Sequence, residues 1–299
     1  MTTSSAEIDR DAMELEYRAA ARRQKIGSRV RAGLAYATLA AFVVVAVGPL
    51  IYIISPTFRK GTDLFAYGAQ WLPDTFYAGN ITFLFENTDF LRWALNTFIV
   101  ATATTVVSLF ISSLAAFAFA TTFFPGSRVL FLAILATMMV PWAALIAPLF
   151  IIVKELGMLN TYQGLILPMV VTPLGVFMLR QFIETLPPGL YEAARLDGAS
   201  DWNIYRRIVL PLIRPALVVL GILVFMSQWS NFLWPLVITT ESDMRTLTVG
   251  IASLRGPGVF VEWGIIAAGA LMTMVPIVLV FLLFQRWFIR ASLAGAIKG

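Results

Sequence analysis

The sequence predicts an all-α integral membrane protein whose chain crosses the membrane six times. Of the 299 residues, 59% are hydrophobic and 13% are charged, whereas about a quarter of the residues of a typical soluble domain are charged. Six stretches without Asp, Glu, Lys or Arg each exceed 18 residues, and a spanning helix needs about 20 apolar residues. The alternating segments of about ten residues that mark a membrane β-barrel are absent, so helices are the expected way to satisfy the backbone in lipid.

The six predicted spans divide the chain into three parts. The spans are Ala32–Phe58, Trp93–Ser127, Val129–Val153, Leu156–Leu179, Pro215–Thr240 and Trp263–Gln285. Residues 1–31 form an amino-terminal segment, residues 32–285 the membrane domain and residues 286–299 a tail. We interpret the first stretch as an uncleaved span rather than a signal peptide, because roughly thirty residues precede it and a signal core is only about 7–15 residues long.

The distribution of lysine and arginine predicts the orientation of the chain. If both ends are cytoplasmic, the inner segments contain 16 of the 22 basic residues and the outer loops contain 6. Basic residues accumulate in the cytoplasmic loops of membrane proteins, so we expect both termini in the cytoplasm.

The composition removes most of the groups that covalent chemistry needs. The chain has no cysteine and no histidine, which excludes disulfides and removes the usual metal ligands and the usual general base. We therefore expect no catalytic residue and no metal site, and an intramembrane enzyme is disfavoured. The predicted spans also lack ionisable residues, which argues against a proton-coupled carrier, while sodium coupling through carbonyl and hydroxyl oxygens stays open.

Residues 187–215, between the fourth and fifth predicted spans, do not resemble a simple connection and predict two short helices. Two prolines end the fourth span, and the sequence from Leu190 to Leu196 favours a helix. A turn is expected at Gly198 because glycine accepts left-handed geometry, and Ser200 is suited to cap the second helix. Such a pair lies in the lipid headgroups or serves as a docking surface for a cytoplasmic partner, and its small residues favour docking.

A motif of fixed spacing lies in this loop. The pattern E-A-A-x-x-x-G-x(9)-I-x-L-P is met at every fixed position, by Glu192, Ala193, Ala194, Gly198, Ile208, Leu210 and Pro211. It resembles the EAA loop of the inner-membrane permease subunits of binding-protein-dependent ABC importers. The runs Leu95–Thr97, Trp229–Pro235 and Phe284–Arg290 and the end of the chain extend this resemblance, which is closest to the second of the two paired permeases in maltose-type sugar importers.

The resemblance implies that the loop is a coupling helix seated in a cleft of a cytoplasmic ATPase. The implied ATPase-coupling residues are Glu192, Ala193, Ala194, Asp197, Gly198, Ala199, Lys298 and Gly299. For the tail that ends in Lys298 and Gly299, contact with anionic lipid is the alternative. The chain contains no G-x-x-x-x-G-K-[ST] phosphate loop, so ATP and magnesium are expected on the partner ATPase and no cofactor on this chain.

The resemblance also implies a function and a set of partners. The expected function is a permease of the bacterial inner membrane that moves a sugar, an oligosaccharide or a related polyol inward by alternating access. The implied partners are a homologous second permease, a pair of ATPase subunits, an extracytoplasmic solute-binding protein and membrane lipid, and no nucleic acid. The alternative function is a self-contained secondary carrier or channel for a small polar solute.

Aromatic and amide side chains at the outer half of the spans are candidates for a substrate pathway, because neutral sugars are held by such groups. The candidates are Asn96, Gln228, Trp229, Asn231 and Trp234. For the two tryptophans the alternative is a belt at the membrane interface, and for the two asparagines it is a helix cap or a bond between helices.

Overall fold

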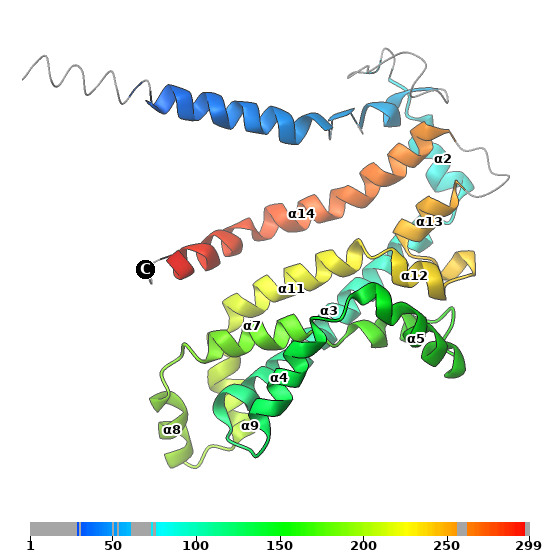
Figure 1. Cartoon of the computed structure of the whole chain (residues 1–299). Helices are drawn as coiled ribbons and strands as arrows, with labels where there is room; N and C mark the ends of the chain where they lie inside the picture. The colour runs from blue at the N-terminus through cyan, green and yellow to red at the C-terminus, as the bar shows by residue number, and fades with distance from the viewer. Residues whose placement is uncertain are drawn as a thin grey trace, which may run out of the picture.

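The computed structural model describes residues 29, 31–49, 51–52, 54–60, 73, 76–255 and 262–296, with side chains described up to residue 285. The described residues form helices and turns, with no strand among them (Figure 1). After a first helix at Arg31–Pro49, the elements are η1 (Ser55–Phe58), α2 (Gly79–Asn87), α3 (Phe90–Thr121), α4 (Ser127–Thr137), α5 (Trp142–Glu155), α6 (Tyr162–Ile166), η2 (Leu167–Met169), α7 (Pro173–Ile183), α8 (Gly189–Leu196), α9 (Asp201–Ile204), η3 (Tyr205–Val209), α10 (Leu210–Leu212), α11 (Arg214–Trp229), α12 (Leu233–Ile238), η4 (Ser242–Met244), α13 (Leu247–Ser253) and α14 (Trp263–Ala296).

Three of the described helices are long and apolar enough to cross a membrane by themselves. They are Arg31–Pro49, α3 and the Trp263–Gln285 part of α14. Three further helix pairs pass the same test only together, and each is bent at a short break: α4 with α5 by 100°, α6 and η2 with α7 by 45°, and α9 and α10 with α11 by 77°. If each bent pair is one span, the structure has up to six spans, in agreement with the predicted number.

Several predicted spans are broken into two helices, although their apolar composition is uniform. The third predicted span is broken between α4 and α5, where Pro141 is the cap residue of α5. The fourth is broken before α7, whose first residue is Pro173. Because proline has no backbone N–H and suits the first turn of a helix, each of these prolines marks a new helix rather than a gentle kink.

The fifth predicted span, Pro215–Thr240, is not a single helix, and this prediction was wrong. Helix α11 ends at Trp229, and the chain turns before the short helix α12 begins at Leu233. Pro235 lies in the first turn of α12, where it supplies no N–H to the preceding residues. An uninterrupted apolar composition therefore indicated residence in the membrane but not an uninterrupted helix.

Helices α3, α7 and α11 form the centre of the bundle and approach one another closely at Gly175. A Cβ atom added there would lie 2.8 Å from Oγ of Ser112 on α3 and 3.1 Å from Cδ2 of Leu220 on α11. The hydroxyl of Thr172, just before α7, is also within 2.7 Å of the Ser108 hydroxyl on α3. Small residues and interhelical hydrogen bonds are the usual means by which membrane helices associate.

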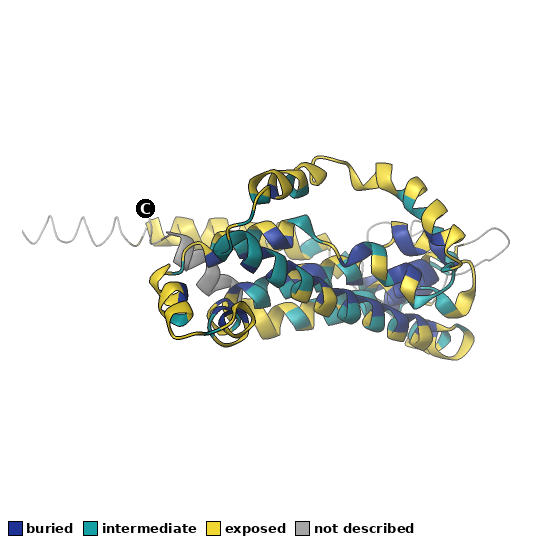
Figure 2. Cartoon of the chain, turned by 90° about the horizontal axis from the view of Figure 1, so that it is seen from below, coloured by how far each residue is buried: buried dark blue, intermediate teal, exposed yellow. Residues whose placement is uncertain are grey.

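Buried residues gather between the helices, while the outer faces of the bundle are exposed (Figure 2). The end that carries α8 and α9 is called the α8 end below, and the opposite end, which carries α2, α12 and α13, is called the α12 end (Figure 1). The first helix, Arg31–Pro49, lies at the outside of the bundle, and none of its apolar window is buried.

Candidate functional site

The two short helices predicted between residues 187 and 215 are present at the α8 end. Helix α8 begins directly after Pro188 and ends at Leu196. Gly198 follows with a φ of +78°, in the left-handed region that favours glycine. The Ser200 hydroxyl then accepts a hydrogen bond of 3.4 Å from the backbone N–H of Asn203 and caps α9. The predicted helices, turn and cap are therefore confirmed.

The six candidate coupling residues of this loop divide between the two sides of the helix pair. Glu192, Ala193, Asp197 and Gly198 are exposed. Ala194 and Ala199 are half-buried and pack against a cluster of buried apolar side chains beneath the pair. The neighbouring Leu196 is 90% exposed, which leaves a large apolar side chain beside the small residues of the motif. The outer side of the pair is thus a surface of small residues with one carboxylate in the first turn of α8, one directly after its end, and the exposed side chain of Leu196.

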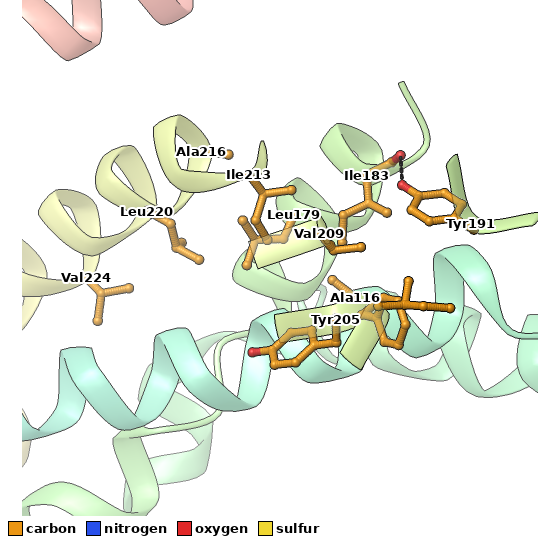
Figure 3. Close-up of a cluster of buried hydrophobic side chains, with 12 residues drawn as sticks. Ala116, Leu179, Ile183, Tyr191, Tyr205, Val209, Ile213, Ala216, Leu220 and Val224 are labelled. Atoms are coloured by element: carbon orange, nitrogen blue, oxygen red, sulfur yellow. Dashed lines mark hydrogen bonds between the residues drawn. The ribbon is translucent and has the colours of Figure 1, made fainter. Parts of the chain in front are cut away.

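The inner side of the helix pair is attached to three bundle helices. Figure 3 shows this cluster, which joins the pair to α3, α7 and α11. Its members are Ala116, Phe117, Leu179, Ile183, Tyr191, Ile204, Tyr205, Val209, Ile213, Ala216, Leu220 and Val224. Close packing of this kind transmits displacement, because protein interiors are dense and have low compressibility.

Two tyrosines add polar contacts to this attachment. The Tyr205 hydroxyl is 2.8 Å from the Ser113 hydroxyl of α3, and both groups are buried. The Tyr191 hydroxyl of α8 donates a long hydrogen bond of 3.5 Å to the backbone carbonyl of Ile183 at the end of α7. Burial raises the pKa of the Tyr191 phenol above its ordinary value, so this group is neutral and remains a donor at physiological pH.

Arg195 is a further link that sequence reasoning did not single out. Its guanidinium donates to the backbone carbonyl of Thr121, the last residue of α3, at 3.1 Å, and to the Asp201 carboxylate at 3.2 Å. The last carbonyls of a helix have no intrahelical partner, so this contact satisfies one of them. Arg195 lies inside the E-A-A-x-x-x-G motif at a variable position, and its contact with α3 depends on a residue 74 positions away, so no local signal indicated it.

The other two candidate coupling residues, Lys298 and Gly299, lie outside the described residues. Much of the outer segment that precedes α2 does so as well, including residues 61–72.

A cavity of about 420 Å³ lies at the break between α11 and α12. Two of the five candidate pathway residues, Gln228 and Asn231, line it. Their side chains meet in a weak contact of 3.4 Å, from Nδ2 of Asn231 to Oε1 of Gln228. Within the described part of the chain, Nε2 of Gln228 and Oδ1 of Asn231 have no hydrogen-bond partner, so one donor and one acceptor of these two lining residues are unused.

Further residues complete this cavity and were not among the candidates. They include Trp142, Thr172, Ser227 and Ser230. Trp142 opens α5, and Thr172 lies at the break before α7. The cavity therefore forms where three segments come together: the start of α5, the break before α7 and the break between α11 and α12. Its lining cannot be read from any one of these segments.

The remaining three pathway candidates do not line this cavity and are buried in the helix packing. Asn96 donates to the backbone carbonyls of Asp243 and Arg245 at 2.8 and 2.9 Å and accepts from the Tyr162 hydroxyl at 2.7 Å. This fits the alternative interpretation of Asn96 as a bond between helices. Its amide joins α3, α6 and the segment before α13, with both donor hydrogens and one lone pair of its oxygen in use.

The two tryptophans are also fixed by hydrogen bonds. Nε1 of Trp229 donates to the carbonyl of Thr273 on α14 at 3.0 Å, and Nε1 of Trp234 donates to the carbonyl of Gly164 on α6 at 3.0 Å. Both side chains are buried in this structure, Trp234 completely. Trp234 stands edge-on to Trp142, with ring centroids 6.3 Å apart, and so supports one wall of the cavity.

Comparison with known proteins gives a consistent result. The chain is 38% identical over 258 residues to the arabinooligosaccharides transport system permease protein AraQ of Halalkalibacterium halodurans, which covers 85% of this chain and 92% of that protein. It is 30% identical over 258 residues to the diacetylchitobiose uptake system permease protein NgcG of Streptomyces coelicolor, covering 85% of each chain.

A solved structure and a family model agree with these relatives. The fold is similar to that of a chain in the crystal structure of a bacterial ABC transporter involved in the import of the acidic polysaccharide alginate, with a TM-score of 0.76, 23% identity, and coverage of 87% of this chain and 97% of that one. Residues 108–292 match the family model described as the inner membrane component of binding-protein-dependent transport systems. The resemblance carried by the motif in residues 192–211 is thereby confirmed, and the chain belongs to the family of binding-protein-dependent transport system inner membrane components.

Proposed function

We propose that this chain is the permease subunit of an ABC importer that moves a carbohydrate or a related polyol into the cytoplasm. The observation that carries this proposal is the α8–α9 pair, which presents small and charged residues outward and is attached underneath to α3, α7 and α11. The carbohydrate class is supported by the relatives, which transport arabinooligosaccharides and diacetylchitobiose according to their names.

In this proposal the α8–α9 pair is the contact with a separate ATPase. Glu192, Ala193, Asp197 and Gly198 touch the ATPase, while Ala194 and Ala199 hold the pair against the bundle. Lys298 and Gly299 extend the contact at the end of the tail. Movement of the ATPase displaces the pair, and the buried cluster passes this displacement to the three attached helices. The chain itself performs no covalent chemistry and holds no cofactor, because ATP and magnesium bind the ATPase.

The solute passes through the cavity at the break between α11 and α12. Gln228 offers its Nε2 and Asn231 its Oδ1 to solute hydroxyls, and Trp142 offers an apolar face. Asn96, Trp229 and Trp234 belong to this pathway as its supports, since each fixes a neighbouring segment through a hydrogen bond. Alternating access requires that these walls move as units, which suits side chains bonded across helices.

The proposed orientation has the α8 end and both termini in the cytoplasm of a bacterial cell and the α12 end outside. A homologous second permease covers apolar surface such as the first helix, Arg31–Pro49, none of whose apolar window is buried. A membrane helix that does not pack against its own bundle can pack only against a neighbouring subunit or lipid. An extracytoplasmic binding protein delivers the solute at the α12 end.

Reconstitution into lipid vesicles tests the proposal. The full-length chain alone is expected to accumulate no labelled arabinooligosaccharide, with or without proton and sodium gradients. The same vesicles containing the complete importer, with binding protein outside and ATP inside, are expected to accumulate it. Accumulation by the chain alone in response to an ion gradient would show a self-contained carrier and contradict the proposal.

A further inference from the structure

A second cavity, of about 340 Å³, lies near the α8 end between the start of α4 and the end of α7. Its lining joins two guanidinium groups to aromatic and apolar side chains. The lining residues are Phe119, Ser127, Arg128, Phe131, Leu132 and Arg180. This cavity is separate from the proposed solute pathway and shares no residue with the proposed ATPase contact.

The two arginines give this cavity a positive charge. Arg180 lies over the ring of Phe131, with its guanidinium carbon 4.0 Å from the ring centroid, and forms an ion pair of 2.7 Å with Glu184. Its Nε is nevertheless buried and has no hydrogen-bond partner within the described residues. Arg128 is exposed and has no acidic partner in the described part of the chain. Two cations and one carboxylate therefore leave one positive charge without compensation.

Neutral donors surround the same space. The Ser127 hydroxyl makes no hydrogen bond within the described residues, and Ser127 is the first residue of α4. The residue before it, Gly126, has no side chain to cap this helix, and the Ser127 backbone N–H donates to the Phe124 carbonyl at 3.2 Å. Two guanidinium groups and a hydroxyl that line one cavity match the oxygens of a phosphate group.

The flank of the cavity is apolar, which decides between a free anion and a lipid. Leu132 lines the cavity and is 55% exposed, and Val129 and Leu130 beside it are 71% and 53% exposed. A phosphodiester that carries acyl chains satisfies both the arginines and this surface, whereas inorganic phosphate satisfies only the arginines. Basic pockets between helices at the cytoplasmic side of membrane proteins are suited to anionic headgroups.

We propose that the Arg128–Arg180 cavity binds the phosphate of an anionic phospholipid of the inner leaflet, with the acyl chains along α4. The proposal uses the orientation proposed above and is independent of the transported solute. Because α7 ends at Ile183, shortly before the α8–α9 pair, a lipid at this site would hold α4 and α7 together beside the attachment of that pair.

Lipid retention by the full-length chain tests the proposal. The chain is purified in detergent with equal amounts of dioleoylphosphatidylglycerol and dioleoylphosphatidylcholine, and bound lipid is counted by native mass spectrometry. Phosphatidylglycerol is expected to be retained in preference. Arg128→Gln is expected to lower its retention about fivefold, which is about 1 kcal/mol per surface arginine converted at about 1.4 kcal/mol per tenfold change. Charge reversal in Arg128→Glu is expected to lower it further.

The matched control is Arg214→Gln, because Arg214 is also exposed, also lies near the α8 end at the start of a helix and does not line the cavity. Its retention of phosphatidylglycerol should equal that of the wild type. Equal retention in Arg128→Gln and the wild type would overturn the proposal, as would displacement of the lipid by inorganic phosphate at equal concentration. None of these outcomes depends on transport, so a failure here is distinguishable from a failure of the proposed function.

Discussion

The two ends of the bundle differ in how far their local sequence determines what their residues do. At the α8 end, a local motif forms a helix pair with an exposed outer surface. The buried side of this pair packs against α3, α7 and α11. At the α12 end, the amides and tryptophans cannot be distinguished by sequence, but the structure divides them into two groups. Gln228 and Asn231 line a cavity. The side chains of Asn96, Trp229 and Trp234 form hydrogen bonds to other segments of the bundle. The comparison shows that a local motif can encode an exposed surface. The polar groups that line a cavity, in contrast, depend on which side chains are not bonded by neighbouring helices.

The largest expected effect is at Gly198 on the α8 end. Replacement by tryptophan adds bulk to the exposed surface and forces a side chain into left-handed geometry, at about 1–2 kcal/mol. We expect uptake to fall to background and the ATPase no longer to co-purify. Gly198→Ala is the control, because it introduces the same backbone strain at position 198 but only a methyl group. This variant should retain most of the uptake. Normal uptake in Gly198→Trp would contradict the proposal that the ATPase binds this surface.

The second effect is on stability at the α12 end. Trp234 is fully buried, so Trp234→Ala is expected to lower the free energy of unfolding by about 3–5 kcal/mol through the cavity it leaves and the lost bond to Gly164. Thermal denaturation of the purified chain measures this. A variant as stable as the wild type would show that Trp234 does not support the wall.

Asn231 should show the opposite behaviour at the same end. It is half-buried and lines the cavity, so Asn231→Ala is expected to leave the melting temperature nearly unchanged. The loss of one hydrogen bond to the solute, about 0.5–1.5 kcal/mol, should raise the solute concentration for half-maximal uptake about 2- to 12-fold. If the melting temperature falls and uptake does not change, Asn231 is a packing residue like Asn96.

A smaller effect is expected inside the attachment at the α8 end. Tyr205→Phe removes the hydrogen bond to Ser113 and should cost about 1 kcal/mol of stability. If this bond transmits movement, ATP hydrolysis by the importer should also respond less to loaded binding protein. Ser113→Ala and the double variant complete a mutant cycle, and additive effects in that cycle would show that the two hydroxyls do not interact.

The smallest effect concerns the pH dependence of the helix pair. Because burial raises the pKa of Tyr191 in the folded chain, its contribution to stability is complete below its ordinary value of about 10 and is lost as pH rises through the folded value. Above pH 10, the melting temperature of the wild type should therefore fall more steeply with pH than that of Tyr191→Phe. Below pH 9, the melting temperatures of the two proteins should change with pH in the same way. Parallel curves throughout would contradict burial of this phenol.

Much of the α8 end could be predicted because its determinants are local. The turn at Gly198 needs only glycine, and the cap at Ser200 needs only a backbone N–H three residues further along. The contact of Arg195 with Thr121 could not be predicted, because it depends on how α3 ends against α8. At the α12 end, Asn96 and Asn231 could not be told apart, since each is an amide in an apolar segment and only its surroundings decide what it bonds.

The sequence by itself determined that the chain resides in the membrane, how its basic residues are distributed and where its E-A-A-x-x-x-G motif lies, because composition and short spacing act without tertiary contacts. Tertiary structure alone decided where the apolar stretches break, as at Trp229 and Leu233, and which polar groups remain unbonded beside those breaks. The physical reason is that a buried polar group takes the nearest available partner, and in this bundle those partners come from helices far apart in the chain.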